Sequence, residues 1–365
     1  MLQIAIPSTS KLPSHAAARP MLSRDADSMY WMSRYVERAE HVARLLLVNS
    51  NLLMDVGELA PTLQQRQWQS VLTVFRLDPV PPGASDGAAA SAAAQAVTTA
   101  PATSPPVTTA PSGPAFGARV AQYMVFDREN PNSLLNCLTR ARENARSVRE
   151  NISAEMWESL NTLYWFIRGD DARGRFEESP DEFYRQVMIA SMLFQGLADQ
   201  TLPHDQGWQF TQLGKLLERV DVTCRIIETK FSILRSADNL MQGAMRNIQW
   251  MAVLRSCCSI EAYRRQHVGD MDPLRVASFL ILEPTFPRSI RYCVEKAHDA
   301  IAAIRAEVNP LAIDQAERIL GRLNTQLEYG EISEILSEGL PAYLTRIQTN
   351  IAEAGFAVQK SYFLH

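Results

Sequence analysis

The stretch 33–46 reads SRYVERAEHVARLL, and the stretch 214–227 reads GKLLERVDVTCRII. In both, apolar residues recur at spacings of three and four, which is the period of a helix that buries one face. A shift of 181 residues superimposes charged positions of the two stretches: Glu37-Arg38 on Glu218-Arg219, Glu40 on Asp221 and Arg44 on Arg225. The sequence therefore predicts that one charged helix occurs twice in the chain.

Weaker matches extend this repeat beyond the two helices. A shift of 182 places WQSVL (68–72) on WMAVL (250–254), and a shift of 142 places ARSVRE (145–150) on PRSIRY (287–292). One long period of this kind is typical of a tandem duplication rather than of a solenoid. Because strand-like alternation is absent as well, we expect an all-α helical bundle. Its two tandemly duplicated halves, 21–200 and 201–365, should be related by a pseudo-two-fold axis.

Two segments differ from the helical remainder. Residues 79–118 are almost wholly Ala, Pro, Thr, Ser and Gly, a composition with few bulky apolar side chains to bury. We expect a disordered Pro/Ala/Thr-rich insertion there, within the first half. Residues 1–20 contain several prolines and no continuous apolar region of the kind that a secretory signal needs. They are expected to be a disordered extension, and Met21 is a candidate for the natural start.

The overall composition excludes several classes of protein. The formal net charge of −4 on 365 residues gives no bulk attraction to nucleic acid or to an anionic membrane. The sequence has no apolar run of the length that a membrane span needs. Its five cysteines have no zinc-type spacing, which favours a reduced cytoplasmic protein with thiols in its core. No nucleotide-binding or metalloprotease motif occurs, so no cofactor is predicted.

The charged residues of the repeated helix lie beside its apolar stripe. Glu40 with Arg44, and Asp221 with Arg225, have the i,i+4 spacing of a stabilising ion pair. Acids in such a partly buried position need further partners. Arginines from other helices are the natural candidates, and we expect them to be Arg142, Arg146, Arg149, Arg288 and Arg291. Arg34 and Arg38 are expected to point away from the stripe, towards solvent or a partner.

Three interpretations of these charges stay open. In the first, the charges are structural and pair across helices. In the second, a metal site of the kind found in helical bundles has carboxylate and imidazole ligands, drawn from Glu37, Glu40, His41, Glu218 and Asp221. Against it, the second copy has Val222 in the place of His41, and nearby arginines would repel a cation. In the third, guanidinium groups form a pocket for carboxylate or phosphate, built from Arg44, Arg142, Arg146, Arg149, Arg225, Arg288 and Arg291.

Four ordered blocks of the sequence resemble the bacterial alpha-E domain family. They are MLSRDADSMYWMSRYVERAEHVARLL (21–46), NARSVRENISAEMWESLN (144–161), GWQFTQLGKLLERVDVTCRI (207–226) and FPRSIRYC (286–293). The resemblance implies an all-helical fold, but it implies no particular reaction. It also implies a context, because such proteins are typically encoded beside, or fused to, a circularly permuted ATP-grasp protein. A transglutaminase-like protein often accompanies them.

The resemblance therefore favours an accessory or partner component of an ATP-grasp-dependent peptide synthesis or modification system. Such a component would present a charged pocket or docking surface. A stand-alone hydrolase or transferase is the alternative, with its acid, base or metal ligand chosen from Glu37, Glu40, Glu218 and Asp221. A purely structural scaffold is the third option. The sequence discloses no reaction.

Overall fold

The computed structural model describes residues 21–56, 61–78, 114–237, 243–269, 271–308 and 314–363. All regular elements of these residues are helices, as the sequence predicts. The first half contains α1 (Ser23–Val56), α2 (Pro61–Val74), α4 (Pro114–Phe126), α5 (Leu134–Ser147), α6 (Ala154–Arg168), α7 (Ala172–Glu178) and α8 (Pro180–Thr201). The second half contains α9 (Gln206–Ala237), α10 (Gly243–Ser256), α11 (Ile260–Gln266), α12 (Pro273–Leu282), α13 (Ile290–Val308), α14 (Gln315–Glu328), α15 (Ile332–Glu338), α16 (Leu340–Val358) and the π-helix η2 (Gln359–Phe363).

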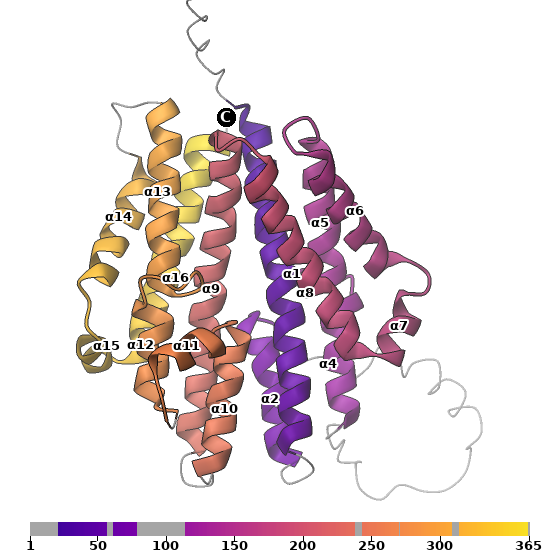
Figure 1. Cartoon of the computed structure of the whole chain (residues 1–365), viewed down its shortest axis with the longest axis vertical. Helices are drawn as coiled ribbons and strands as arrows, with labels where there is room; N and C mark the ends of the chain where they lie inside the picture. The colour runs from indigo at the N-terminus through magenta and orange to yellow at the C-terminus, as the bar shows by residue number, and fades with distance from the viewer. Residues whose placement is uncertain are drawn as a thin grey trace, which may run out of the picture.

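The two charged helices, α1 and α9, lie side by side in the middle of the molecule (Figure 1). Gly214 of α9 permits their close approach, because a Cβ atom built on it would lie 2.3 Å from the carbonyl oxygen of Tyr30. This crossing buries α1 on all sides: every residue from Ala39 to Leu47 is buried. Glu37, Glu40 and Arg44 of α1 are therefore inside the protein, whereas the sequence predicts them at the edge of the apolar stripe.

Each central helix has its own set of flanking helices. Helices α5 and α8 pack on α1, and α6 packs on both of them. Helices α13 and α16 pack on α9, and α14 packs on both of them. Figure 1 shows these two groups on opposite sides of the central pair. A single cluster of buried apolar side chains runs through both groups and includes Leu138, Val220 and Ile301. The central charges are therefore enclosed by one continuous core.

The sequence match of 145–150 with 287–292, at a shift of 142, does not correspond to equivalent positions in the structure. Residues 145–150 end α5, but residues 287–292 begin α13. A shift of 156 instead aligns the starts of the two helices. Ser133 accepts a hydrogen bond from the Asn136 amide, and Ser289 accepts one from the Tyr292 amide. Both are N-caps that satisfy a free amide of the first helical turn. The short arginine-containing segments therefore occupy different places in the two helices, whereas the two serines occupy the same place.

The expected boundary of the insertion is also corrected. Residues 114–118 belong to α4 and not to the Pro/Ala/Thr-rich insertion. Phe116 and Val120 of this helix are buried, and that packing holds the segment in place. Residues 79–113 and 1–20, for which we expect disorder, lie outside the described residues.

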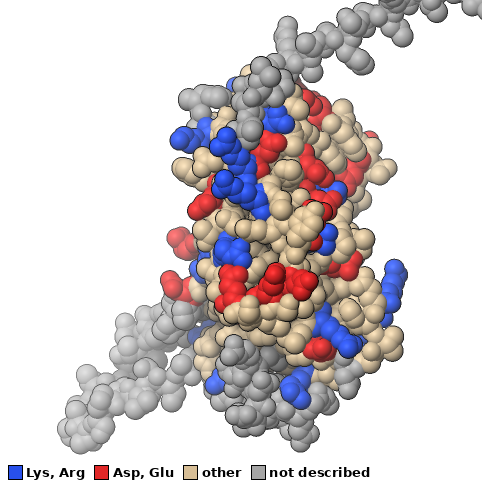
Figure 2. All heavy atoms as spheres, turned by 90° about the vertical axis from the view of Figure 1, so that its left-hand side faces the viewer, with Lys and Arg blue, Asp and Glu red and all other residues tan. Residues whose placement is uncertain are grey.

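The surface formed by α13 to α15 carries no patch of purely positive or purely negative charge in the view of Figure 2. Figure 2 shows basic and acidic side chains interspersed there. Arg305 and Glu317 form one such pair at 2.5 Å. Among the helices that the structure describes, none has the length and apolarity needed to cross a membrane.

Candidate functional site

Glu37 lies at the centre of a buried cluster of charges between α1 and α9. Arg219 donates to its two carboxylate oxygens, from Nε at 2.6 Å and from Nη2 at 3.0 Å. Gln195 of α8 also donates to it, and Nη1 of Arg288 lies 3.6 Å away. Burial disfavours the charged form, but the two guanidinium groups outweigh burial and hold the pKa of Glu37 well below its usual range. Glu37 is therefore an anion at neutral pH.

Glu40 belongs to the same cluster, one helical turn further along α1. Nη1 of Arg288 donates to it at 3.1 Å, and Nε of Arg44 at 2.7 Å. Burial raises the pKa of Glu40, but Arg288 and Arg44 reverse this effect, and the net change is downward. Arg288 thus lies between both acids, as the sequence predicts for one of the arginines outside the two charged helices.

His41 completes the only group of possible metal ligands found among the described residues. Ligand atoms of Glu37, Glu40 and His41 lie within 4.8 Å of one another. Nε2 of His41 is 3.3 Å from Glu37, yet neither ring nitrogen makes a well-directed hydrogen bond. The donor types suit a transition metal, but guanidinium groups occupy the carboxylates. A cation would have to displace Arg288, so the arrangement favours ion pairing over metal binding.

Glu218 forms a second, separate cluster on the other side of the contact. Nε and Nη2 of Arg38 donate to it at 2.5 and 2.8 Å, and Nε of Arg34 at 3.0 Å. Burial opposes ionisation, but these two arginines lower the pKa of Glu218 to about 2. The expectation that Arg34 and Arg38 point towards solvent or a partner is therefore wrong, because both bind Glu218 of the same chain. Glu218 does not join Glu37 and Glu40 in one ligand set.

Asp221 and Arg225 form the ion pair that their spacing predicts. Their side chains meet at 2.5 Å and are only partly buried. Burial raises the pKa of Asp221 more than Arg225 lowers it. Burial also lowers the pKa of Arg225. This pair lies at the wall of a small pocket with Arg34 and Gln348.

Four of the expected arginine partners are not at the acidic residues of α1 and α9. Arg142 contacts Glu143 and Asn161, and Arg146 is an exposed partner of Glu143. Arg149 lies over the ring of Trp157, with 5.0 Å between its Cζ atom and the ring centre. The charge of Arg291 helps to lower the pKa of Glu283. The expectation is wrong for Arg142, Arg146 and Arg149 because the arginines at the end of α5 face α6 and solvent. It is wrong for Arg291 because this residue of α13 lies near Glu283 instead. Only Arg288 reaches the central acids.

A pocket of about 530 Å³ opens beside the Glu37 cluster, between α8, α9 and α13. Arg219 and Gln195, which both bind Glu37, also line this pocket. Its other walls carry residues of both charges and two aromatic rings, among them Asp199, Trp208, Lys215, Tyr292, Lys296 and Asp299. The buried cluster is therefore connected to a polar cavity.

Lys215 is the distinctive cation of this pocket. It is only 9% exposed, and no hydrogen bond or ion pair holds its ammonium group among the described residues. Burial lowers its pKa, Arg219 lowers it further, and Asp199 opposes them. Sequence reasoning missed Lys215, although lysine is rare in this arginine-rich chain, at positions 11, 215, 230, 296 and 360. A lysine in so arginine-rich a chain is therefore a sequence feature that could have identified Lys215 as a candidate binding residue.

The residues at this centre match a known sequence family. The model of the Alpha-E family, described as a predicted alpha-helical domain with a conserved ER motif, matches residues 21–363. The chain belongs to this family. The dipeptides Glu37-Arg38 and Glu218-Arg219 both fit the ER motif of the Alpha-E description. In the structure, each glutamate binds the arginine of the other dipeptide.

Relatives of this Alpha-E chain include longer proteins. Uncharacterized proteins of Mycobacterium bovis and of two strains of Mycobacterium tuberculosis are 24% identical to it over 367 residues. The alignments cover 95% of this chain and 37% of each relative, so the chain spans about a third of their length. No solved structure matches the chain.

Proposed function

We propose that this Alpha-E protein is an accessory component of an ATP-grasp-dependent peptide synthesis or modification system. Its role is to hold a peptide substrate by a free carboxylate in the pocket between α8, α9 and α13. The observation that carries the proposal is the unpaired ammonium group of Lys215 in that pocket. The greater length of the mycobacterial relatives agrees with an Alpha-E unit that acts together with other domains.

The charges of the pocket support a peptide ligand. A buried cation without an anion is costly, and a carboxylate that binds it recovers part of that cost. Asp199 supplies negative charge for an amino group, and Trp208 offers an apolar surface for a side chain. The rigid Glu37–Arg219 pair positions one wall, because both residues are saturated with partners. The pocket thus combines a free cation with fixed surroundings.

We further propose that the two halves arose by tandem duplication. Nε2 of Gln67 donates to Oε1 of Gln249 at 2.9 Å across 182 residues, the shift of the sequence repeat. A residue that contacts its own equivalent lies on a two-fold axis. Arg76 and Cys258, also 182 apart, both have positive φ, 54° and 55°, at the ends of α2 and α10. Such a shared and sparsely populated backbone conformation supports common descent.

Calorimetric titration with short peptides tests the pocket. We expect a peptide with a free C-terminus to bind, and its C-terminal amide to bind about 10-fold more weakly or worse, since one charged contact is lost. Lys215→Met should remove this preference. Lys296→Met is the matched control, because Lys296 already pairs with Glu295 and Asp299. Equal binding of acid and amide would contradict the carboxylate role.

Co-purification tests whether the chain associates with an ATP-grasp protein. The tagged chain should retain the neighbouring circularly permuted ATP-grasp protein, and a transglutaminase-like protein where one is encoded. Deletion should change the products of the ligase. If there is no association and the products are unchanged, the chain is not an accessory component, and the scaffold interpretation gains support.

A carboxylate-dependent hydrolase or transferase is the second candidate, because Glu37, Glu40 and His41 converge within 4.8 Å. Metal analysis of the purified protein tests it directly. Stoichiometric transition metal that is lost in Glu40→Ala and His41→Ala would favour this candidate over the accessory role. The ion pairs of Arg44 and Arg288 argue for the opposite result.

A further inference from the structure

Lys230 is a buried lysine that has no acidic partner. It is 5% exposed, and among the described residues no carboxylate lies within ion-pair distance of it. Its Nζ atom donates to Oε1 of Gln67 at 2.6 Å and to Oγ of Ser70 at 2.8 Å. Gln67 is fixed in turn by its hydrogen bond to Gln249. Burial alone lowers the pKa of Lys230 to about 7, so a large fraction of this amine is neutral at physiological pH.

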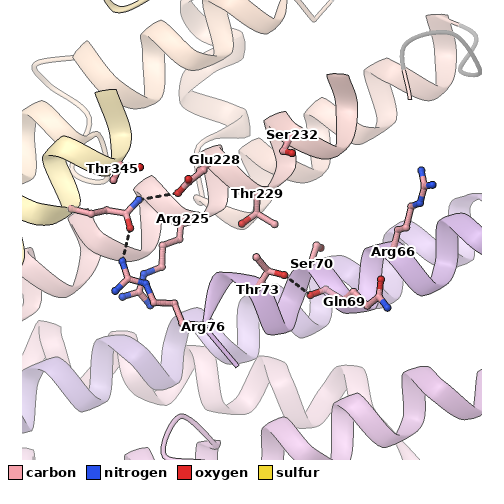
Figure 3. Close-up of a pocket in the computed structure, with 11 residues that line it drawn as sticks. Arg66, Gln69, Ser70, Thr73, Arg76, Arg225, Glu228, Thr229, Ser232 and Thr345 are labelled. Carbon is pink, nitrogen blue, oxygen red and sulfur yellow. Dashed lines mark hydrogen bonds between the residues drawn. The ribbon is translucent and has the colours of Figure 1, made fainter. Parts of the chain in front are cut away.

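Ser70 connects this amine to a second pocket, which lies between α2 and α9. The pocket has a volume of about 580 Å³, and Ser70 forms part of its lining. Figure 3 shows Ser70 between Arg66 at one end and Arg76 with Arg225 at the other. The Ser70 hydroxyl donates to the carbonyl of Gln67 at 2.6 Å, and rotation about its C–O bond would direct the same proton to Lys230.

We propose that Ser70 and Lys230 form a serine–lysine dyad that hydrolyses a carboxylate-bearing ester in this pocket. Ser70 is the nucleophile and Lys230 the general base. A neutral amine next to a hydroxyl is a known replacement for the histidine of a serine hydrolase. This site is separate from the peptide pocket and does not depend on the function proposed for that pocket.

The chemistry balances with water as the only co-reactant. Oγ of Ser70 attacks the ester carbonyl, and neutral Lys230 accepts the hydroxyl proton. The bond to the leaving alkoxide breaks, and the ammonium of Lys230 returns the proton to that oxygen. Water then attacks the acyl-serine with Lys230 as base again, which releases the carboxylic acid and restores Ser70.

The arginines define the class of substrate. Arg66 and Arg76 are exposed, and among the described residues Arg76 donates a single side-chain hydrogen bond, from Nη2 to Gln348 at 2.8 Å. Free guanidinium donors at the ends of a pocket bind a carboxylate in a bidentate manner. An ester whose acyl chain ends in a carboxylate therefore fits this pocket better than a neutral ester of equal length.

Ester hydrolysis with the full chain tests the dyad. We expect mono(4-nitrophenyl) adipate to be hydrolysed with a kcat/KM at least about 10-fold above that of 4-nitrophenyl hexanoate. Arg76→Gln should narrow that difference. Ser70→Ala and Lys230→Met should each reduce the adipate rate by about 100-fold or more. The wild-type rate should rise with pH around the Lys230 midpoint of about 7.

A covalent probe makes the result independent of slow turnover. An alkyl fluorophosphonate should label Ser70, as peptide mapping by mass spectrometry would show, and Lys230→Met should abolish the label. Ser256→Ala is the control, because Ser256 is equally buried and bonds only to the carbonyl of Ala252. Ser70→Ala removes a single oxygen atom and serves if Lys230→Met does not fold. Unlabelled Ser70, or an adipate rate unchanged in Ser70→Ala, would overturn the proposal.

Discussion

Arg219 of α9 donates two hydrogen bonds to Glu37 of α1, and both side chains are buried. The reciprocal pair, Arg38 of α1 with Glu218 of α9, is built in the same way. Taking such charges out of water is expensive, so their attraction does little more than offset desolvation. What they specify is the register of the two helices, because a slip along the axis would leave four buried charges unpaired.

Removal of one partner should therefore be costly. Glu37→Gln keeps the size of the side chain but leaves Arg219 without its anion, and it leaves Arg288 with Glu40 alone. We expect a loss of about 3 to 5 kcal/mol in the free energy of unfolding, measured in urea. Glu143→Gln breaks an exposed pair with Arg142 and Arg146 and should cost less than about 1 kcal/mol. Similar losses in both variants would contradict a buried, register-setting pair.

Acid should weaken the same contact at Glu218. Its pKa is about 2 in the folded protein and 4.5 without partners. The folded protein therefore binds fewer protons than the unfolded chain in this range, and stability is present above pH 4.5 and lost as the pH falls towards 2. The lowered pKa corresponds to about 3 kcal/mol. Unfolding in urea between pH 7 and pH 3 detects the larger part of this loss, about 2 kcal/mol.

The control for the acid effect is Asp221, whose pKa is raised. A raised carboxyl pKa makes the opposite contribution, because the folded protein then holds its proton more tightly. The stability advantage of the wild type over Glu218→Gln should shrink as the pH falls. The difference between wild type and Asp221→Asn should not shrink in that way. A pH-independent gap for Glu218→Gln would disprove the assignment.

The close approach of α1 and α9 can be tested at a glycine. A methyl group at Gly214 would lie 2.3 Å from the Tyr30 oxygen, a backbone atom that cannot move alone. Gly214→Ala should lower the melting temperature and cost about 1 to 3 kcal/mol. In Gly196→Ala, on the exposed face of α8, the new methyl group meets nothing within 4 Å. That variant should gain roughly 0.5 to 1 kcal/mol from helix propensity. Stabilisation of both variants would show that helix propensity outweighs any steric conflict at Gly214, and would contradict the close approach.

The sequence predicts the local part of this architecture well. The recurrence of apolar residues at spacings of three and four identifies α1 and α9. The i,i+4 spacing predicts the ion pairs of Glu40 with Arg44 and of Asp221 with Arg225. The partners of Glu37 and Glu218 could not be predicted in this way. They come from a different helix, and the choice between neighbouring arginines depends on how α1 and α9 rotate about their axes.

The burial of Lys215 and Lys230 is a second feature that could not be predicted from the sequence. Lys215 and Lys230 lie on the central helix α9, and nothing in their neighbourhood along the chain distinguishes them from solvated charges. Their burial follows from α8 and α13 covering one side of α9 and α2 covering another. A shift of 181 places Asn49 opposite Lys230, and this break in the repeat adds to the rarity of lysine as a sequence feature that distinguishes the residue.

Lys230 should make the protein more stable in mild alkali. Its pKa is about 7 in the folded state and about 10.4 in an unfolded chain. The unfolded chain therefore binds more protons between these values, so stability rises with pH through this window. Buried cysteines with raised pKa values, such as Cys137 and Cys257, oppose this trend above about pH 8.5. The window from pH 7 to 8.5 is the informative one.

Lys230→Met isolates the effect, because it fills the same space without an ionisable group. We expect the urea midpoint of the wild type to increase between pH 7 and 8.5, and that of Lys230→Met to increase less. Since burial of the charged amine is unfavourable, the variant should also be at least as stable as the wild type at pH 7. Lys296→Met is the comparison, because Lys296 is only partly buried and already paired. Identical pH slopes for wild type and Lys230→Met would show that Lys230 is protonated in the folded protein and cannot act as the base for Ser70.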